Sequence, residues 1–270
     1  MLSAMSLASP TRMSSAVVLG WLCVLPALPA DEVASHTFDS KGVSIYYTVE
    51  GAGPPVLLVH GLYSSGQMNW RLPGVTKALA KDYQVVTIDV RGHGRSGKPE
   101  KESDYGVEMV EDLVRLLDQL NIKKAHVIGY SMGGMITMKL LTTHPERVES
   151  AILGGMGWLR EGSRLQEFWG RLPERQNAKG TPQACPRSLG ALAVTESEVK
   201  AIKLPVEVIV GDHDPVRGMY VEPLKTMRPD WPVKVVPDAG HITCITQPEF
   251  RDDILKWLSD RSGVKAHRAP

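Results

Sequence analysis

The sequence has few cysteines and no excess of either charge. Its 270 residues include three cysteines, and 31 basic residues against 30 acidic ones leave a formal net charge of +1. Because no block of basic residues stands out, we expect neither a nucleic-acid partner nor binding to a charged membrane surface. Metal-binding spacings of the C-x-x-C or H-E-x-x-H kind are missing, so we expect neither a metal nor a cofactor. A small neutral molecule is the expected partner.

Apolar runs that could span a bilayer are also missing. The apolar run at residues 16–28 is interrupted by Pro26 and is shorter than the roughly 20 residues that a membrane-spanning helix requires. Arg12 precedes this run, and Ala30 follows it just before an acidic pair. The arrangement predicts a signal peptide over residues 1–30, cleavage near Ala30, and export to the periplasm or the medium without a stable membrane anchor. An uncleaved anchor or a later start codon is the alternative.

Cleavage there would leave Cys185 and Cys244 in the mature chain. Exported proteins favour disulfides, but the spacing of two cysteines does not determine the distance between them. A disulfide between the two residues and a pair of buried thiols therefore both remain open.

Short apolar runs alternate with helical patterns along residues 31–270. Val56–Val59 is a continuous apolar run, which is typical of a strand buried on both faces of a parallel sheet. Val43–Glu50 alternates apolar and polar residues, which indicates an antiparallel edge strand. Apolar residues recur at helical spacing in residues 70–81 and 107–120. The alternation predicts one α/β domain with a doubly wound, mostly parallel sheet.

Residues 156–203 interrupt this alternation. Large apolar residues in the first third are spaced as on a helix, and a segment that contains Gly, Pro and Thr follows at 177–186. We predict a cap insertion, part helix and part loop, over the strand ends where open sheets bind ligands. Met156, Trp158 and Trp169 are candidates to line a substrate pocket there, and ordinary core positions are the alternative.

The stretch from Gly129 to Gly133 carries a serine at G-x-S-x-G spacing. An apolar run precedes the motif and a helical pattern over residues 132–143 follows it, which predicts a strand, a tight turn and a helix. Small residues around Ser131 permit a turn so sharp that the hydroxyl stands clear of the sheet. Free N–H groups at the start of the helix favour developing negative charge. Ser131 is therefore the candidate nucleophile.

A serine attacks only when a base takes its proton and a third group orients that base. His241 and Asp214 each follow a predicted strand, at its carboxyl end. Because the carboxyl ends of parallel strands meet at one edge of a sheet, we expect both side chains near Ser131. The sequence predicts a catalytic triad in the chain order Ser131, Asp214, His241. Asp212 is the alternative acid.

Taken together, these motifs resemble those of the α/β-hydrolase superfamily, close to its branch of esterases, lipases and haloperoxidase-like enzymes. The likeness extends from about Gly42 to Leu258. It rests on the serine motif and on turns at Val59-His60-Gly61-Leu62, Asp89-Val90-Arg91-Gly92-His93-Gly94-Arg95-Ser96, Gly211-Asp212-His213-Asp214 and Ala239-Gly240-His241. The resemblance implies the α/β-hydrolase fold with a short cap insertion after the sixth strand. It also implies an oxyanion hole formed by the backbone N–H groups of Leu62 and Met132.

Two other histidines lie inside these motifs. His60 is better explained as part of the oxyanion turn than as the base, because His241 is the better partner for Ser131. His213 lies between two aspartates, but adjacent residues point in different directions, so we expect an ordinary loop there rather than a metal site.

The serine in the motif also narrows the activity. Haloalkane dehalogenases and epoxide hydrolases of this superfamily carry aspartate at the same position, so the resemblance disfavours both activities. We expect a serine hydrolase that cleaves a carboxylic ester or related acyl bond of a small neutral substrate through an acyl-enzyme. A haloperoxidase-like perhydrolase and a carbon–carbon bond hydrolase are the enzymatic alternatives. A ligand receptor that uses the same pocket is the non-enzymatic one.

Overall fold

The computed structural model describes residues 33–172 and 180–263. The predicted signal peptide and its cleavage site near Ala30 lie outside the described residues and stay a prediction. Within the described residues, no helix is both long and apolar enough to cross a membrane.

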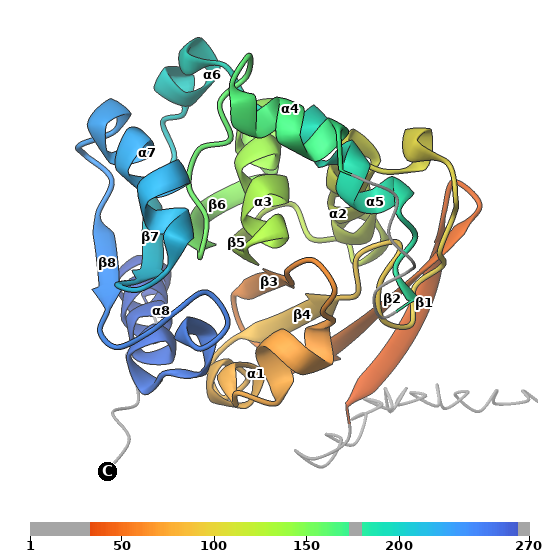
Figure 1. Ribbon diagram of the computed structural model, residues 1–270. Helices are drawn as coiled ribbons and strands as arrows, with labels where there is room; N and C mark the ends of the chain where they lie inside the picture. The colour runs from red at the N-terminus through yellow and green to blue at the C-terminus, as the bar shows by residue number, and fades with distance from the viewer. Residues whose placement is uncertain (1–32, 173–179, 264–270) are drawn as a thin grey trace, which may run out of the picture. The chain divides into compact units, whose positions relative to one another are not determined.

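One eight-stranded sheet runs through the centre of the domain, in the order β1-β2-β4-β3-β5-β6-β7-β8 (Figure 1). β1 and β2 pair antiparallel with each other, β2 pairs antiparallel with β4, and every other pair is parallel. The predicted doubly wound, mostly parallel sheet is thus confirmed. The strands are β1 (Ala34–Ser40), β2 (Val43–Glu50), β3 (Pro55–Val59), β4 (Gln84–Ile88), β5 (Ala125–Tyr130), β6 (Val148–Gly154), β7 (Val206–Gly211) and β8 (Val233–Val236).

The prediction that Val43–Glu50 forms an edge strand is wrong. β2 lies between β4 and β1, and β1 occupies the edge. β1 escapes sequence analysis because most of its side chains are exposed or half-buried and only Phe38 and Ser40 are buried. It therefore lacks the apolar pattern that marks the other strands.

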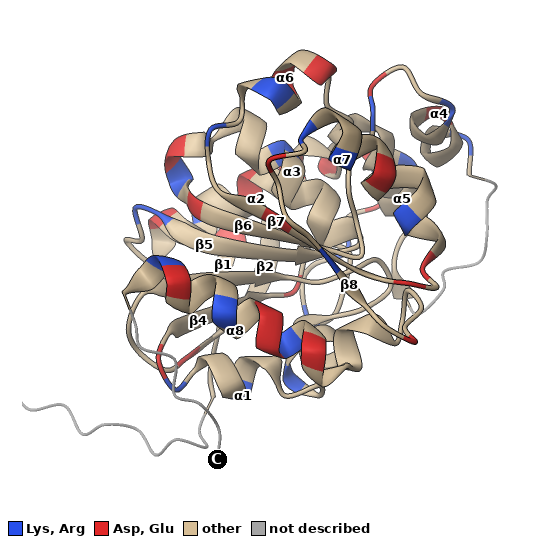
Figure 2. Ribbon diagram, turned by 90° about the vertical axis from the view of Figure 1, so that its left-hand side faces the viewer, with Lys and Arg blue, Asp and Glu red and all other residues tan. Residues whose placement is uncertain are grey.

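Helices cover both faces of the sheet (Figure 2). α2 (Val107–Gln119) and α3 (Met132–Thr143) pack on one face, and α1 (Val75–Leu79) and α8 (Pro248–Ser262) pack on the other. Alternate residues of β3 enter the two cores, with Leu57 and Val59 on the α2 and α3 face and Val56 and Leu58 on the opposite one. Both faces are therefore buried, as the continuous apolar run indicates.

The single helix predicted over residues 70–81 is two short ones. A π-helical turn at Gln67–Arg71 precedes α1, and Pro73 and Gly74 separate the two. Gly74 adopts a φ of 82°, in the left-handed region. This residue therefore interrupts the helix before α1 begins.

The segment between β6 and β7 has secondary structure of its own. It contains α4 (Arg164–Gly170), α5 (Ala184–Ser188), a 3-10 turn at Leu189–Leu192 and α6 (Glu196–Ala201). Trp169 lies on α4, whereas Trp158 precedes the helix. The helix predicted from the spacing of large apolar residues therefore starts several residues before the observed one. The segment's role as a substrate cap stays a prediction.

Both described cysteines are free, buried thiols. Of the two alternatives that the sequence leaves open, the structure has the pair of buried thiols and not the disulfide. Burial raises the pKa of both thiols, that of Cys244 to about 12, so neither is a ready nucleophile.

A buried ion pair joins the turn after β4 to helix α2. The Arg91 guanidinium donates two hydrogen bonds of 2.6 Å to the two carboxylate oxygens of Asp112, and both side chains are almost fully buried. Arg91 also donates to the carbonyl of Asp104, while the hydroxyl of Ser40 at the end of β1 donates to Asp112. The pair thus ties the antiparallel edge of the sheet to the turn that follows β4.

Asp112→Ala should leave the buried guanidinium of Arg91 without its counter-ion. We expect a loss of about 3–5 kcal/mol in the free energy of unfolding, measured by urea denaturation. Glu222→Ala, which removes an ion pair to Arg217 between two exposed side chains, is the control and should cost no more than about 1 kcal/mol. Equal losses in the two variants would contradict a structural role for the buried pair.

Glu207 on β7 is a buried carboxyl group whose Oε1 atom has no hydrogen-bond partner. Burial, followed by repulsion from Asp253, raises its pKa to about 7. The folded protein therefore holds a proton that the unfolded chain releases at a lower pH.

Because of this retained proton, the contribution of Glu207 to the free energy of unfolding should fall as the pH rises from about 4.5 to about 7. Glu207→Gln cannot ionise, so its advantage over the wild type in the urea midpoint should grow across that window. Glu222→Gln, at an exposed position, should show no such trend. A difference between Glu207→Gln and wild type that is the same at pH 5 and pH 8 would refute the account.

Candidate active site

Ser131 occupies a strained turn between β5 and α3. Its backbone has a φ of 54° and a ψ of −114°, which non-glycine residues rarely adopt. Its N–H donates to the carbonyl of Gly154 at 2.8 Å. The turn also brings backbones very close together: a Cβ atom on Gly133 would lie 2.1 Å from the carbonyl oxygen of Val59. Only glycine fits at that position.

The structure brings the three residues of the predicted triad together. His241 Nε2 lies 2.9 Å from Ser131 Oγ, and His241 Nδ1 lies 2.8 Å from Asp214 Oδ2. Because a carboxylate can only accept, the Nδ1 atom carries the proton and Nε2 is free to accept from the serine hydroxyl. The side chain of Asp214 is fully buried, whereas that of His241 is 32% exposed.

Asp212, the alternative acid, has different partners. Its two carboxylate oxygens accept the backbone N–H groups of Asp238 and Ala239, both at 3.0 Å. The bond from Ala239 is the main reason why the pKa of Asp212 is lowered. Asp212 thus holds the backbone just before His241, while Asp214 contacts the imidazole.

The turn after β3 lies directly against the serine. A Cβ atom on Gly61 would be 3.3 Å from the Cβ atom of Ser131. The N–H group of Gly61 donates to Asn69 Oδ1 at 2.7 Å. In contrast, the N–H groups of Leu62 and Met132 donate to no other described residue. Their role as an oxyanion hole stays a prediction. Nothing in the sequence pattern points to Asn69.

His60 is a buried, neutral part of this turn. Its Nε2 atom accepts the N–H of Val90 at 2.9 Å, so the proton is on Nδ1 and is donated to the carbonyl of Gly61 at 2.8 Å. Burial lowers the pKa of His60 to about 4. With both ring nitrogens engaged, His60 joins the turn after β3 to the end of β4 and has no nitrogen left to act as a base.

The three candidate pocket residues all contact the main hydrophobic core. Trp158 is 4% exposed, and its indole N–H donates to the carbonyl of Val194. Trp169 is half-buried, and its indole N–H donates to the hydroxyl of Tyr220. Met156 packs closely on Gly134, near the start of α3. Their role in binding substrate stays a prediction.

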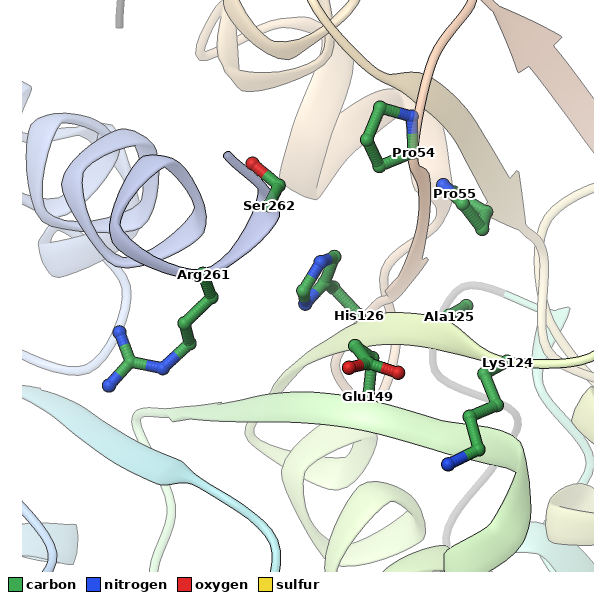
Figure 3. Close-up of a pocket in the computed structure, with 8 residues that line it drawn as sticks. All are labelled: Pro54, Pro55, Lys124, Ala125, His126, Glu149, Arg261 and Ser262. Carbon is green, nitrogen blue, oxygen red and sulfur yellow. The ribbon is translucent and has the colours of Figure 1, made fainter. Parts of the chain in front are cut away.

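Two other features of the described residues lie outside the triad. Ligand atoms of Asp212, His213 and Asp238 lie within 4.8 Å of one another, but both oxygens of Asp212 already accept backbone N–H groups. A pocket of about 240 Å³ lies at the amino ends of β3, β5 and β6, the edge opposite to the serine (Figure 3). Its lining includes Pro54, His126 and Arg261, whose guanidinium stacks on Trp257 instead of pointing into the pocket.

Comparisons with known proteins agree with this architecture. A family model described as alpha/beta hydrolase fold matches residues 54–195. The uncharacterized carboxylesterase nap of Bacillus subtilis is 24% identical over 247 residues, which cover 78% of this chain and 81% of that protein. The uncharacterized hydrolase YraK of the same bacterium is 40% identical over 121 residues, and the match covers only 44% of each protein.

Solved structures show the same fold. The epoxide hydrolase VrEH1 of Vigna radiata superimposes with a TM-score of 0.68 at 18% identity, covering 86% of this chain and 100% of that one. At this identity the likeness concerns the fold alone.

Asp214→Asn and Asp212→Asn should separate the two carboxylates by function. If Asp214 orients the imidazole, its amide variant should lower kcat by about 10³- to 10⁴-fold, since the amide disturbs the tautomer of His241. Asp212→Asn keeps one oxygen acceptor and should cost less than about tenfold. Steady-state kinetics with an activated ester measure both. A severe loss in Asp212→Asn beside a nearly silent Asp214→Asn would reverse the assignment.

Proposed function

Because the chain belongs to the α/β-hydrolase fold family, we propose that it is a serine hydrolase that cleaves a carboxylic ester or related acyl bond of a small neutral substrate. The observation that carries the proposal is the continuous hydrogen-bonded chain from Ser131 through His241 to the buried carboxylate of Asp214. In this arrangement the imidazole can accept the hydroxyl proton of Ser131 at Nε2 while Nδ1 donates to Asp214, as nucleophilic catalysis requires.

The first half of the proposed reaction forms an acyl-enzyme. His241 Nε2 takes the hydroxyl proton of Ser131 as Oγ attacks the substrate carbonyl carbon. Asp214 stabilises the imidazolium through the Nδ1–H hydrogen bond. His241 then gives its proton to the leaving oxygen, the bond between the carbonyl carbon and that oxygen breaks, and the alcohol departs.

The second half returns the enzyme to its starting state. Water attacks the acyl carbon while His241 takes a proton from it, and the tetrahedral intermediate expels Ser131 Oγ. His241 then returns its proton to Oγ, and the carboxylic acid leaves. The cycle consumes the ester and one water molecule and releases the alcohol and the carboxylic acid, so atoms and protons balance without a cofactor.

The N–H groups of Leu62 and Met132, which donate to no other described residue, would form the oxyanion hole in both halves of the cycle. The carbonyl oxygen becomes negative when either nucleophile attacks. Two backbone donors would hold that charge, Leu62 in the turn after β3 and Met132 at the start of α3. Each such donor contributes about 3 kcal/mol to the lowering of the barrier in a site that excludes water. The N–H of Met132 also lies at the positive end of the α3 dipole.

Serine as the nucleophile favours acyl chemistry over epoxide opening, although VrEH1 shares the fold. An attack by serine on a carbonyl gives an acyl ester that water can hydrolyse. Epoxide hydrolases of this superfamily instead use a carboxylate as the nucleophile. The name of one sequence relative, a carboxylesterase, is consistent with this choice.

A series of p-nitrophenyl esters, from acetate to long acyl chains, tests the proposal with Ser131→Ala and a fluorophosphonate label. We expect turnover in the wild type, a loss on the order of 10⁴-fold or more in Ser131→Ala, and labelling that this substitution abolishes. Ser197→Ala, an exposed position on α6, is the matched control and should behave as the wild type.

The chain length with the highest kcat/KM measures the size of the acyl pocket. Labelling that persists in Ser131→Ala would identify another nucleophile and refute the proposal. A single burst of product without turnover would favour the receptor alternative instead.

A further inference from the structure

The proposed base lies on a partly exposed turn. His241 follows β8 by five residues, and the next side chain, Ile242, is 82% exposed. The His241 side chain itself is partly exposed. A shift of about 1 Å in a catalytic group can cost about 100-fold in rate, so the backbone of this turn must be held from elsewhere.

Tyr130 supplies one such contact. Its hydroxyl donates a hydrogen bond of 2.6 Å to the backbone carbonyl of His241. The two rings also lie against each other, with 5.7 Å between centroids and 36° between planes. Tyr130 is the last residue of β5 and directly precedes Ser131. The nucleophile and the contact to the base therefore come from consecutive residues.

Tyr130 itself has almost no freedom to move. The residue is 3% exposed, and its ring packs edge-on against Phe250 at 5.6 Å. A Cβ atom on either Gly154 or Gly155 would lie 2.8 Å from the ring. Burial raises the pKa of the hydroxyl, so it stays a donor throughout the pH range in which such enzymes act.

The turn is held a second time, through Asp212. Its carboxylate accepts the N–H groups of Asp238 and Ala239, and this fixes the backbone before His241. The carbonyl that accepts from Tyr130 belongs to His241 itself, two residues after Ala239. Beyond Ala239, the described hydrogen bonds within the turn join Gly240 to Thr243 and Cys244, so the bond from Tyr130 is the one that a residue of the central sheet donates to the backbone of His241.

We propose that Tyr130 is a positioning residue for the base: its hydroxyl sets where the backbone of His241 lies and thereby the distance from the imidazole to Ser131. The inference rests on the proposed function. It extends that function, because it assigns a role to the variable second residue of the G-x-S-x-G motif.

Tyr130→Phe removes the hydroxyl and keeps the ring. We expect kcat for a p-nitrophenyl ester to fall about 10- to 100-fold with KM changed less than twofold, because the proton transfer is misaligned while the substrate contacts remain. The rate of phosphonylation of Ser131 should fall in parallel, with full labelling reached at long times. Tyr83→Phe is the matched control: it removes another buried tyrosine hydroxyl, one that contacts Ser262 instead, and should leave kcat unchanged.

A second readout does not need turnover. The Nδ1 proton shared by His241 and Asp214 should give a low-field ¹H NMR signal, assigned by its loss in His241→Gln. Tyr130→Phe should shift or broaden this signal, and Tyr83→Phe should not. A wild type that hydrolyses no ester would defeat the proposed function, while the NMR signal would still test the position of the imidazole.

Three results would overturn the proposal. One is an unchanged kcat and an unchanged NMR signal in Tyr130→Phe. Another is a lower apparent kcat that is fully explained by a smaller fraction of protein that reacts with the fluorophosphonate. That result would show that part of the variant is unfolded. The third is an equal loss of kcat in Tyr83→Phe, which would show a general effect of removing a buried hydroxyl.

Discussion

The site depends on one strained turn, the one at Ser131. A serine with positive φ costs about 1–3 kcal/mol, and the surrounding contacts must hold it in place. The N–H of Ser131 is bonded to Gly154 on β6, and Gly133 lies so close to Val59 on β3 that no side chain fits between them. Neighbouring strands on both sides of β5 therefore clamp the turn. As a result the hydroxyl, the start of α3 and the turn after β3 meet at one point.

Around that turn, two aspartates with the same side chain have different roles because they differ in burial and in hydrogen-bond partners. Asp214 is buried and contacts the imidazole, whereas Asp212, two residues away, is partly exposed and binds the backbone of the next loop. The histidines divide in the same way: His60 is buried with both nitrogens occupied, and His241 keeps one nitrogen for the serine. In each pair, the hydrogen-bond partners separate the group that can act in catalysis from the group that supports it.

Much of this arrangement is predictable from sequence, for identifiable reasons. Parallel strands buried on both faces leave continuous apolar runs, so β3 is found to within one residue. The residues that form the triad contacts are predictable because they follow such strands. β1 is missed because it is polar, and Asn69, Tyr130 and Asp212 are missed as supports because their roles depend on distances across the fold. Pairing of Cys185 with Cys244 was likewise a question of distance, which the spacing of two residues cannot answer.

The most direct test of the account is a crystal structure of the protein after reaction with a small alkyl fluorophosphonate. The tetrahedral phosphorus imitates the intermediate of acyl transfer. We expect the phosphorus on Ser131 Oγ, its oxygen within hydrogen-bond distance of the N–H groups of Leu62 and Met132, and the His241 carbonyl still bonded to Tyr130. Phosphorus on another residue, or an oxygen that points into solvent away from both N–H groups, would contradict the account.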